Sequence, residues 1–239
     1  MVGFAMDRRA MMVAGSGAIG AMAVAAAVAR SAESSDASLG PIPNLGGRIP
    51  VAFVMGEGAT MIDFAGPWEV FQDVVVDGNR SAFELFTVGV GTAPIRTSGG
   101  MTVTPDYAFG DAPLPGIVVV PAQRGGPELR DWLRKVHRDK ALVLSVCTGA
   151  FQVAAAGLLD GKEATTHHDF YDTFAQKYPA VKLQRGLRFV KSDDRLYTAG
   201  GLSSGIDLAL HIVDRLHGHD VAQRTADYME YQGNGWKSR

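Results

Sequence analysis

The sequence has little cysteine, no excess of charge of either sign and no long charged run, and each of these absences excludes a class of protein. Only one of its 239 residues is cysteine, which excludes an intramolecular disulfide and a zinc site built on several thiolates. The 23 lysines and arginines nearly balance 25 aspartates and glutamates, so the chain has no electrostatic footprint for nucleic acid. With 46% hydrophobic residues, the composition is that of a globular protein that acts on, or senses, a small molecule.

The first 29 residues predict an export signal rather than part of a fold. Arg8 and Arg9 precede an uncharged run that extends to Ala29, which is the pattern of a twin-arginine signal. We expect cleavage after Ala29, with Ala32 as the alternative, and hence a periplasmic protein that meets the membrane only transiently. An uncleaved membrane anchor is the other interpretation, because about 20 residues can just span a bilayer. Residues 30–48, rich in serine, glycine and proline, predict a linker.

From Ile49 onward, short apolar runs alternate with helical patterns, which is typical of a parallel sheet flanked by helices. The expected strands are 51–55, 83–90, 117–120, 141–146, 187–190 and 196–199, and the expected helices are 67–74, 127–140, 150–159, 206–216 and 220–231. Residues 95–104 predict a small hairpin around a glycine turn. We therefore predict one doubly wound, mostly parallel, flavodoxin-like α/β domain over residues 49–232, followed by a tail at 233–239. Its ligand site should lie at the carboxyl ends of the strands.

The only cysteine, Cys147, falls where the expected strand 141–146 meets the expected helix 150–159. A strand-to-helix turn of this kind forms a nucleophile elbow that exposes its central residue, and Gly149 leaves room for a neighbouring backbone. The start of a helix favours thiolate, so we predict that Cys147 is a nucleophile with a lowered pKa. The alternative is a buried, inert cysteine.

Three stretches of the sequence together resemble the ThiJ/PfpI superfamily. They are the cysteine turn with the segment after it, the stretch around the first expected helix, and a glycine-rich stretch before the penultimate helix: 145–151 with 155–161 and 164–167, 63–71, and 200–207. The resemblance spans residues 49–231 and is nearest to the isonitrile hydratase branch and to the amidotransferase-like domain of AraC-type regulators. It implies a homodimer, and we expect a small-molecule substrate without cofactor or nucleic-acid partner.

In the isonitrile hydratase branch an acid, the cysteine and the following threonine form the active site, so the resemblance implies Asp63, Cys147 and Thr148. We expect Asp63 in a loop that opens on the same sheet edge as Cys147. The thiolate would then attack the terminal carbon of an isonitrile, a protonated Asp63 would deliver a proton, and water would release an N-substituted formamide. Asp63 as a helix N-cap and Thr148 as an ordinary turn residue are the alternatives.

Two adjacent histidines follow the expected helix 150–159. His167 matches a histidine of the family, whereas His168 stands where relatives usually have tryptophan. Adjacent side chains on an extended segment point to opposite faces, so at most one should face Cys147, and we favour His167. Both could instead be ordinary hydrogen-bonded histidines. By the same geometry the consecutive residues His167, His168 and Asp169 should not converge on one ion, so we expect no metal.

Residues 121–126 depart from the Pro-Gly-Gly sequence that many relatives have after the corresponding strand, and whose amides usually stabilise an oxyanion. Ala122 can still donate its N–H, and Gln123 or Arg124 could line the site instead. The expected substrate-binding residues are Ala122, Gln123, Gly149 and His168.

Other activities of the family lack their residues in this chain. A PfpI-type peptidase has histidine directly after the cysteine, where Thr148 stands, and the His-x-Glu pair of glutaminases does not occur after Cys147. Only eight residues follow Tyr231, so we do not expect a helix-turn-helix module. A non-catalytic ligand sensor, and a protective thiol protein that reacts with oxidants or carbonyl compounds, are the alternatives to a hydratase.

Overall fold

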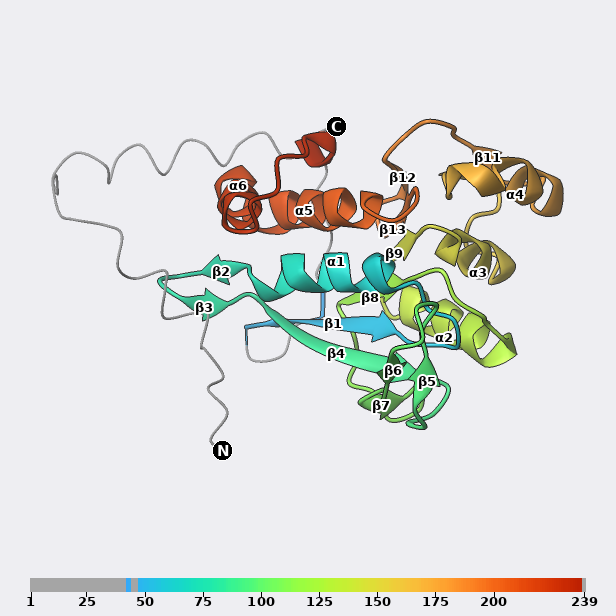
Figure 1. The fold of residues 1–239 in the computed structure, drawn as a ribbon, viewed down its shortest axis with the longest axis horizontal. Helices are drawn as coiled ribbons and strands as arrows, with labels where there is room; N and C mark the ends of the chain where they lie inside the picture. Colours follow the sequence, from blue (N-terminus) through green and yellow to red (C-terminus); the bar gives the residue numbers. More distant parts are fainter. Residues whose placement is uncertain (1–41, 44–46, 238–239) are drawn as a thin grey trace, which may run out of the picture. The chain divides into compact units, whose positions relative to one another are not determined.

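The computed structural model describes residues 42–43 and 47–237 (Figure 1). The expected export signal and most of the expected linker lie outside these residues. The described residues belong to one compact unit, residues 39–239. Among them, no helix has both the length and the apolar character needed to cross a membrane.

In chain order the elements are β1 (Ile49–Val54), α1 (Met61–Gln72), β2 (Val75–Val76), β3 (Arg80–Ser81), β4 (Phe83–Gly89), β5 (Ile95–Arg96), β6 (Thr102–Val103), β7 (Tyr107–Ala108), β8 (Ile117–Val120), α2 (Pro127–Arg138), β9 (Leu142–Val146), α3 (Gly149–Ala155), β10 (Glu163–Ala164), the 3₁₀ turn η2 (His168–Phe170), α4 (Tyr171–Lys177), β11 (Lys182–Leu183), β12 (Phe189–Asp193), β13 (Leu196–Ala199), α5 (Ser204–His217), α6 (His219–Tyr228) and η3 (Gly235–Lys237).

A seven-stranded sheet with the order β12-β13-β9-β8-β1-β4-β7 forms the centre of the fold. Its neighbouring strands are parallel, except that β12 and β13, where the sequence indicated two late strands, form an antiparallel hairpin. The chain runs from β1 to β4 and then returns to β8 on the other side of β1, so the winding reverses between β1 and β8. The predicted doubly wound α/β fold is confirmed. Its ligand crevice is expected at the carboxyl ends of β1 and β8, where the connections after these two strands lead to opposite faces of the sheet.

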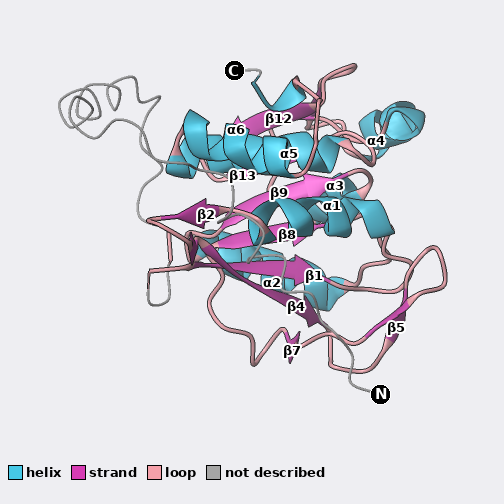
Figure 2. Cartoon of the chain, turned by 60° about the vertical axis from the view of Figure 1, so that its left-hand side comes forward, coloured by secondary structure: helices cyan, strands magenta, loops and turns pink. Residues whose placement is uncertain are grey.

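Helices cover both faces of this sheet. One buried cluster joins α1, α5 and α6 to Phe53 and Leu144, and a second joins α2, α3 and α4 to Ala52 and Val143. Figure 2 shows α1, α5 and α6 together on one side of the sheet and α2 on the other. Successive strand residues point to opposite faces, so a strand covered on both faces is apolar throughout. This explains why β8 is entirely buried and why its bounds match the prediction.

The first helix differs from its prediction. We expected it at 67–74 with Pro67 near its start, but α1 begins at Met61 and holds Pro67 in its interior. Proline lacks the N–H that would bond to the carbonyl four residues earlier, which is why it usually marks a helix start. Here the ring packs on α5, since a Cβ on Gly205 would lie 3.2 Å from Pro67 Cγ. Asp63 therefore lies in the first turn of α1 rather than in a loop, and Thr60 is the N-cap.

Other differences are short elements that local patterns did not indicate. The elbow helix α3 ends at Ala155 instead of Leu159, and Gly157 with φ 76° terminates this stretch. The pairs β2–β3 and β10–β11, and the helices η2 and α4, were not expected. From residue 233 we expected a tail, but Trp236 is 1% exposed and belongs to the core cluster beside α5. The hairpin of β5 and β6 is confirmed.

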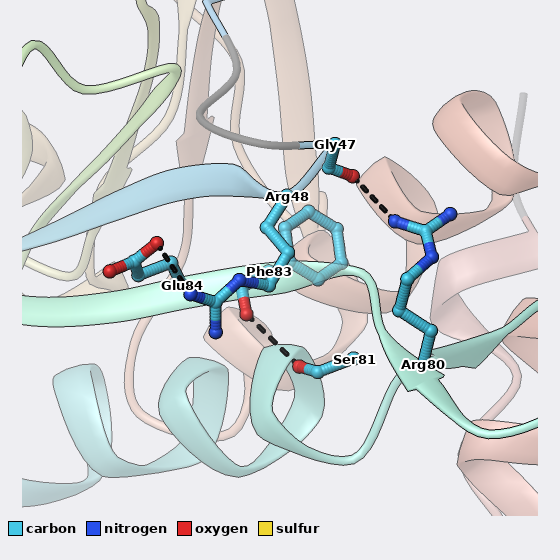
Figure 3. Close-up of polar contacts among 6 residues, drawn as sticks. All are labelled: Gly47, Arg48, Arg80, Ser81, Phe83 and Glu84. Atoms are coloured by element: carbon cyan, nitrogen blue, oxygen red, sulfur yellow. Dashed lines mark hydrogen bonds and ion pairs between the residues drawn. The ribbon is translucent and has the colours of Figure 1, made fainter.

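Residues before β1 are fastened at the amino end of the sheet (Figure 3). Arg80 donates to the carbonyl of Gly47 at 2.7 Å, and Arg48 pairs with Glu84 at 2.9 Å. Both partners of the Arg48–Glu84 pair are more than 40% exposed, so this pair adds little stability. These contacts lie at the opposite edge of the sheet from Cys147, which follows the carboxyl end of β9.

Candidate active site

Cys147 lies in the turn between β9 and α3 with a φ of 58°, a conformation that non-glycine residues seldom adopt. Its amide donates to the carbonyl of Gly200 at 2.9 Å, and its carbonyl accepts from Thr166 Oγ1 at 2.8 Å. Its side chain is nearly buried, with the residue 7% exposed. A Cβ on Gly149 would lie 2.1 Å from the carbonyl oxygen of Val120, so glycine allows α3 to begin against the end of β8.

The first turn of α1 brings the carboxyl of Asp63 to Cys147. Asp63 is fully buried, and its Oδ2 accepts a hydrogen bond from the amide of Ala122 at 3.0 Å. Its Oδ1 has no hydrogen bond of ordinary geometry among the described residues. The Cys147 thiol and the Leu202 amide nevertheless lie close enough to act on this carboxyl. Asp63, which follows β1, thus meets Ala122, which follows β8, at the point where the winding of the sheet reverses.

Burial changes the acidity of both groups. It raises the pKa of Asp63 from 3.8 to about 6, although hydrogen bonds from Ala122, Cys147 and Leu202 oppose the rise. Burial and then the negative charge of Asp63 raise the pKa of Cys147 from 9.0 to about 11, against the amides of Thr148 and Leu202. At neutral pH the proton therefore resides on sulfur, and the carboxyl is mostly ionised.

The prediction of a lowered pKa for Cys147 is therefore wrong. It assumed that the start of a helix stabilises the thiolate, but α3 has only seven residues and the thiol is withdrawn from water. The neighbouring carboxylate of Asp63 repels a second negative charge and adds to the effect of burial. Asp63, which we expected as a protonated acid, does have a raised pKa, but at about 6 it leaves the carboxyl mostly ionised at neutral pH.

The loop after β8 does not offer the oxyanion donor that we expected. The amide of Ala122 is already bonded to Asp63. Gln123, by contrast, has a buried side-chain amide whose oxygen and nitrogen both lack partners among the described residues. A Cβ on Gly56 would lie 2.9 Å from Gln123 Oε1, so the loop after β1 confines this side chain. Thr148 is the N-cap of α3, but its side chain makes no capping hydrogen bond.

The two histidines do not point to opposite faces, and that prediction is wrong. Their rings stack with centroids 4.4 Å apart, because His168 begins the 3₁₀ turn η2 and the segment is no longer extended there. The His168 side chain is 74% exposed and that of His167 only 15%. His167 lies against the site loop, since a Cβ on Gly201 would lie 2.0 Å from its Cδ2. Its Nδ1 accepts from the amide of Asp169 at 3.2 Å.

The same turn contradicts our expectation that the side chains of three consecutive residues would not converge on one metal ion. Donor atoms of His167, His168 and Asp169 lie within 4.8 Å of one another, so consecutive residues do converge here. Two of these three side chains are strongly exposed, and we assign no ion to them.

Sequence reasoning missed the role of Leu202. Its backbone has φ 54°, and its amide acts on both Asp63 and Cys147. The preceding pair Gly200-Gly201 was a sequence signal of a special backbone at this point, but nothing in it singled out the next amide.

The fold and this arrangement define an α/β protein with a buried acid–thiol pair at the carboxyl edge of its sheet. Residues 50–215 match the DJ-1/PfpI family, and the chain belongs to that family. It is 30% identical to isonitrile hydratase from Pseudomonas putida over 77% of this chain and 78% of that protein. It is also 33% identical to the HTH-type transcriptional regulator CdhR from Pseudomonas aeruginosa, over 56% of this chain and 41% of the regulator.

Solved structures agree with this assignment at the level of the fold. A THiJ/PfpI family protein from Pseudomonas syringae superposes with a TM-score of 0.69 at 22% identity, covering 86% of this chain and 85% of its own. Drosophila melanogaster DJ-1beta gives a TM-score of 0.66 at 19% identity, covering 78% of this chain and 100% of its own.

Proposed function

We propose that this protein is a cysteine-dependent hydratase that converts an isonitrile, R–NC, to an N-substituted formamide. The observation behind this proposal is the fully buried carboxyl of Asp63, which accepts from the amide of Ala122 and lies within interaction distance of the only thiol of the chain. The similarity to isonitrile hydratase favours this substrate class.

In the resting pair the thiol of Cys147 carries the proton, and Asp63 acts first as a base. When the sulfur attacks the terminal carbon of R–NC, a C–S bond forms and the thiol proton passes to Asp63. Asp63 then delivers this proton to the same carbon, which gives a thioimidate, R–N=CH–S–Cys147. The resting proton therefore lies on the thiol of Cys147, the group with the higher pKa. We had expected it on the carboxyl of Asp63, beside a thiolate.

Water completes the cycle by addition to the thioimidate carbon. One water proton goes to nitrogen and the hydroxyl to carbon, which gives a tetrahedral intermediate. Breaking the C–S bond then releases R–NH–CHO, and sulfur recovers the hydroxyl proton through Asp63. The net reaction adds one water molecule to R–NC to give the formamide, and it needs no oxidant or reductant.

The other residues have supporting roles in this proposal. The amides of Thr148 and Leu202 approach the sulfur and stabilise developing negative charge on it. The unpartnered amide of Gln123 is suited to bind substrate, and Gly149 lets α3, which follows Cys147, begin directly against the end of β8. His167 is placed against the site loop, where it would orient water, and His168 would shape the entrance. From family resemblance we also propose a homodimer, which light scattering at the mass of one chain would refute.

A ligand sensor is the second candidate. A thiol with a pKa of about 11 is a poor nucleophile until a base removes its proton, and a site that only binds ligands would tolerate it. Two relatives, CdhR and GbdR, are transcriptional regulators, although the chain spans only 41% and 50% of their lengths. A sensor would bind an isonitrile or another small ligand, or respond to an oxidant, without forming product.

The test is product formation from a panel of isocyanides, glyoxals and oxidants, with the free thiol followed in parallel. We expect formamide from an isocyanide in the wild-type protein, none in Cys147→Ser, and a loss on the order of 10²-fold in Asp63→Asn. Asp111→Asn, a change at an exposed carboxyl in the loop after β7, is the matched control and should retain full activity. Ligand binding without formamide would favour the sensor, and thiol loss only with oxidants or glyoxals would favour the protective function.

A further inference from the structure

The carboxylate of Asp207 is buried in the first turn of α5, and the proposed reaction does not use it. It is 1% exposed, and it accepts from the side chain of Arg188, the amide of Trp236 and the hydroxyl of Tyr231. Arg188 approaches Oδ2 through Nε at 2.6 Å and through Nη2 at 2.5 Å. The amide of Trp236 donates to Oδ1 at 3.1 Å. The Arg188 side chain is 43% exposed, but Asp207 is buried, so loss of Arg188 would leave an uncompensated charge inside the protein.

The C-terminal segment is built around this carboxylate. The Trp236 side chain is buried, and its carbonyl lies 3.4 Å from His211 Nδ1 on α5. A Cβ on Gly235 would lie 2.7 Å from Asp207 Oδ2, so only glycine allows η3 to approach so closely. The end of the described chain thus holds Asp207 from one side, although it is far in sequence from both Asp63 and Cys147.

Arg188 connects the carboxylate to the loop beside Cys147. Its Nη2 donates to Ser203 Oγ at 3.2 Å, and its carbonyl accepts from the amide of Gly200 at 2.9 Å. The carbonyl of Gly200 in turn accepts from the amide of Cys147. Arg188 therefore holds the loop 200–203 at both ends.

This loop needs such support because of its middle residue. Leu202 has φ 54°, which is unfavourable for a residue with a Cβ, and its side chain is 46% exposed and so makes few contacts. In this conformation its amide reaches the acid–thiol pair.

We propose that Asp207 and Arg188 are positioning residues for the active site. Together with the buried Trp236, they hold the loop 200–203 so that the amide of Leu202 faces Asp63 and Cys147. The benefit for catalysis rests on the proposed function, but the positioning itself is a property of the thiol and can be measured without any substrate.

The experiment measures the rate of Cys147 alkylation by iodoacetamide at pH 9, together with the melting temperature. Asp207→Asn keeps an oxygen for the Trp236 amide but removes the charge that holds Arg188. Loss of the Leu202 amide should decrease the thiolate fraction, so we expect alkylation on the order of threefold slower in Asp207→Asn and in Arg188→Gln. Arg188→Lys keeps the charge and should recover part of the rate.

The matched control is Asp193→Asn, which breaks a part-buried ion pair with Lys162. Asp193 precedes β13, which runs parallel to β9, so the control lies at the opposite edge of the sheet from Cys147. We expect this variant to lower the melting temperature and to leave the alkylation rate unchanged.

Equal alkylation rates in the wild-type protein, Asp207→Asn and Arg188→Gln would overturn the proposal and leave a purely structural ion pair. If those variants do not fold, Ser203→Ala decides, because it removes only the exposed hydroxyl that Arg188 contacts; an unchanged rate there counts against positioning. The two proposals fail separately. Slower alkylation without isocyanide turnover in the wild-type protein would refute the hydratase alone, whereas turnover with unaltered alkylation would refute the positioning alone.

Discussion

Asp63 ionises in a place where burial opposes ionisation, and this has a consequence for stability. Below pH 3.8 the carboxyl is protonated in both the folded and the unfolded chain, so it costs nothing. As the pH rises from 3.8 to about 6, the unfolded chain loses this proton first and folding becomes less favourable. Above that range the cost is complete and is at most about 3 kcal/mol.

Asp63→Asn should therefore stabilise the protein at pH 8 while it removes activity. An asparagine oxygen can still accept from Ala122, and the charge is gone. Urea unfolding should show a gain of up to about 3 kcal/mol at pH 8 and little change at pH 4. The exposed control Asp111→Asn should show no such difference, and a destabilised Asp63→Asn at pH 8 would contradict the account.

The thiol provides the second prediction at this scale. Alkylation of Cys147 across pH should have its midpoint near 11, the value to which burial and the Asp63 charge raise its pKa. Asp63→Asn removes the charge contribution and should move the midpoint downward, toward the ordinary value of 9.0. A wild-type midpoint at or below the ordinary value, unaffected by residue 63, would show that the two groups do not interact.

Among the elements, the buried strands could be predicted and the first helix could not. Four consecutive apolar residues, Ile117–Val120, predict a strand that is covered by helices on both faces of the sheet. The observed β8 has these bounds and is fully buried. Pro67 misled the prediction because its cost is offset by packing on α5, a contact 138 residues away in the chain that no local pattern contains. The prediction that His167 and His168 point to opposite faces failed for a similar reason. The 3₁₀ turn η2 is too short to produce a periodic pattern in the sequence.

The site shows the same division. The position of Cys147 after an apolar strand indicated the sheet edge, but the acidity of its thiol depends on burial and on the neighbouring carboxylate. The bond between Asp63 and Ala122 joins residues 59 apart, and the role of the Leu202 amide depends on one backbone angle. Such contacts follow from the assembled fold rather than from local sequence.

The contact between α3 and β8 yields a prediction for Gly149. A methyl group there would lie 2.1 Å from the carbonyl oxygen of Val120, so Gly149→Ala must push α3 away from the sheet. We expect a loss of about 1–3 kcal/mol or more in urea unfolding, with lower activity because Cys147 moves with the helix. Gly110→Ala is the control, because a methyl group there meets nothing within 4 Å. Equal stability of the two variants would contradict the close packing.

For the whole molecule, we propose export through the paired arginines, which lie outside the described residues. Replacing Arg8 and Arg9 by lysines keeps the charge but removes the motif that the translocase recognises. Cell fractionation should find the wild-type protein in the periplasm, starting near Arg30, and the double variant retained in the cytoplasm. Full-length protein in the cytoplasm in both cases would contradict export.

The most direct test of the account is to trap the covalent intermediate. The protein would be mixed with an isocyanide, quenched in acid within one turnover and digested, and the peptide that contains Cys147 would be weighed by mass spectrometry. The account predicts an added mass equal to that of the isocyanide on this peptide, no adduct in Cys147→Ser, and less adduct in Asp63→Asn because Asp63 removes the thiol proton. Formamide production by Cys147→Ser at the wild-type rate, with no adduct in either protein, would contradict it.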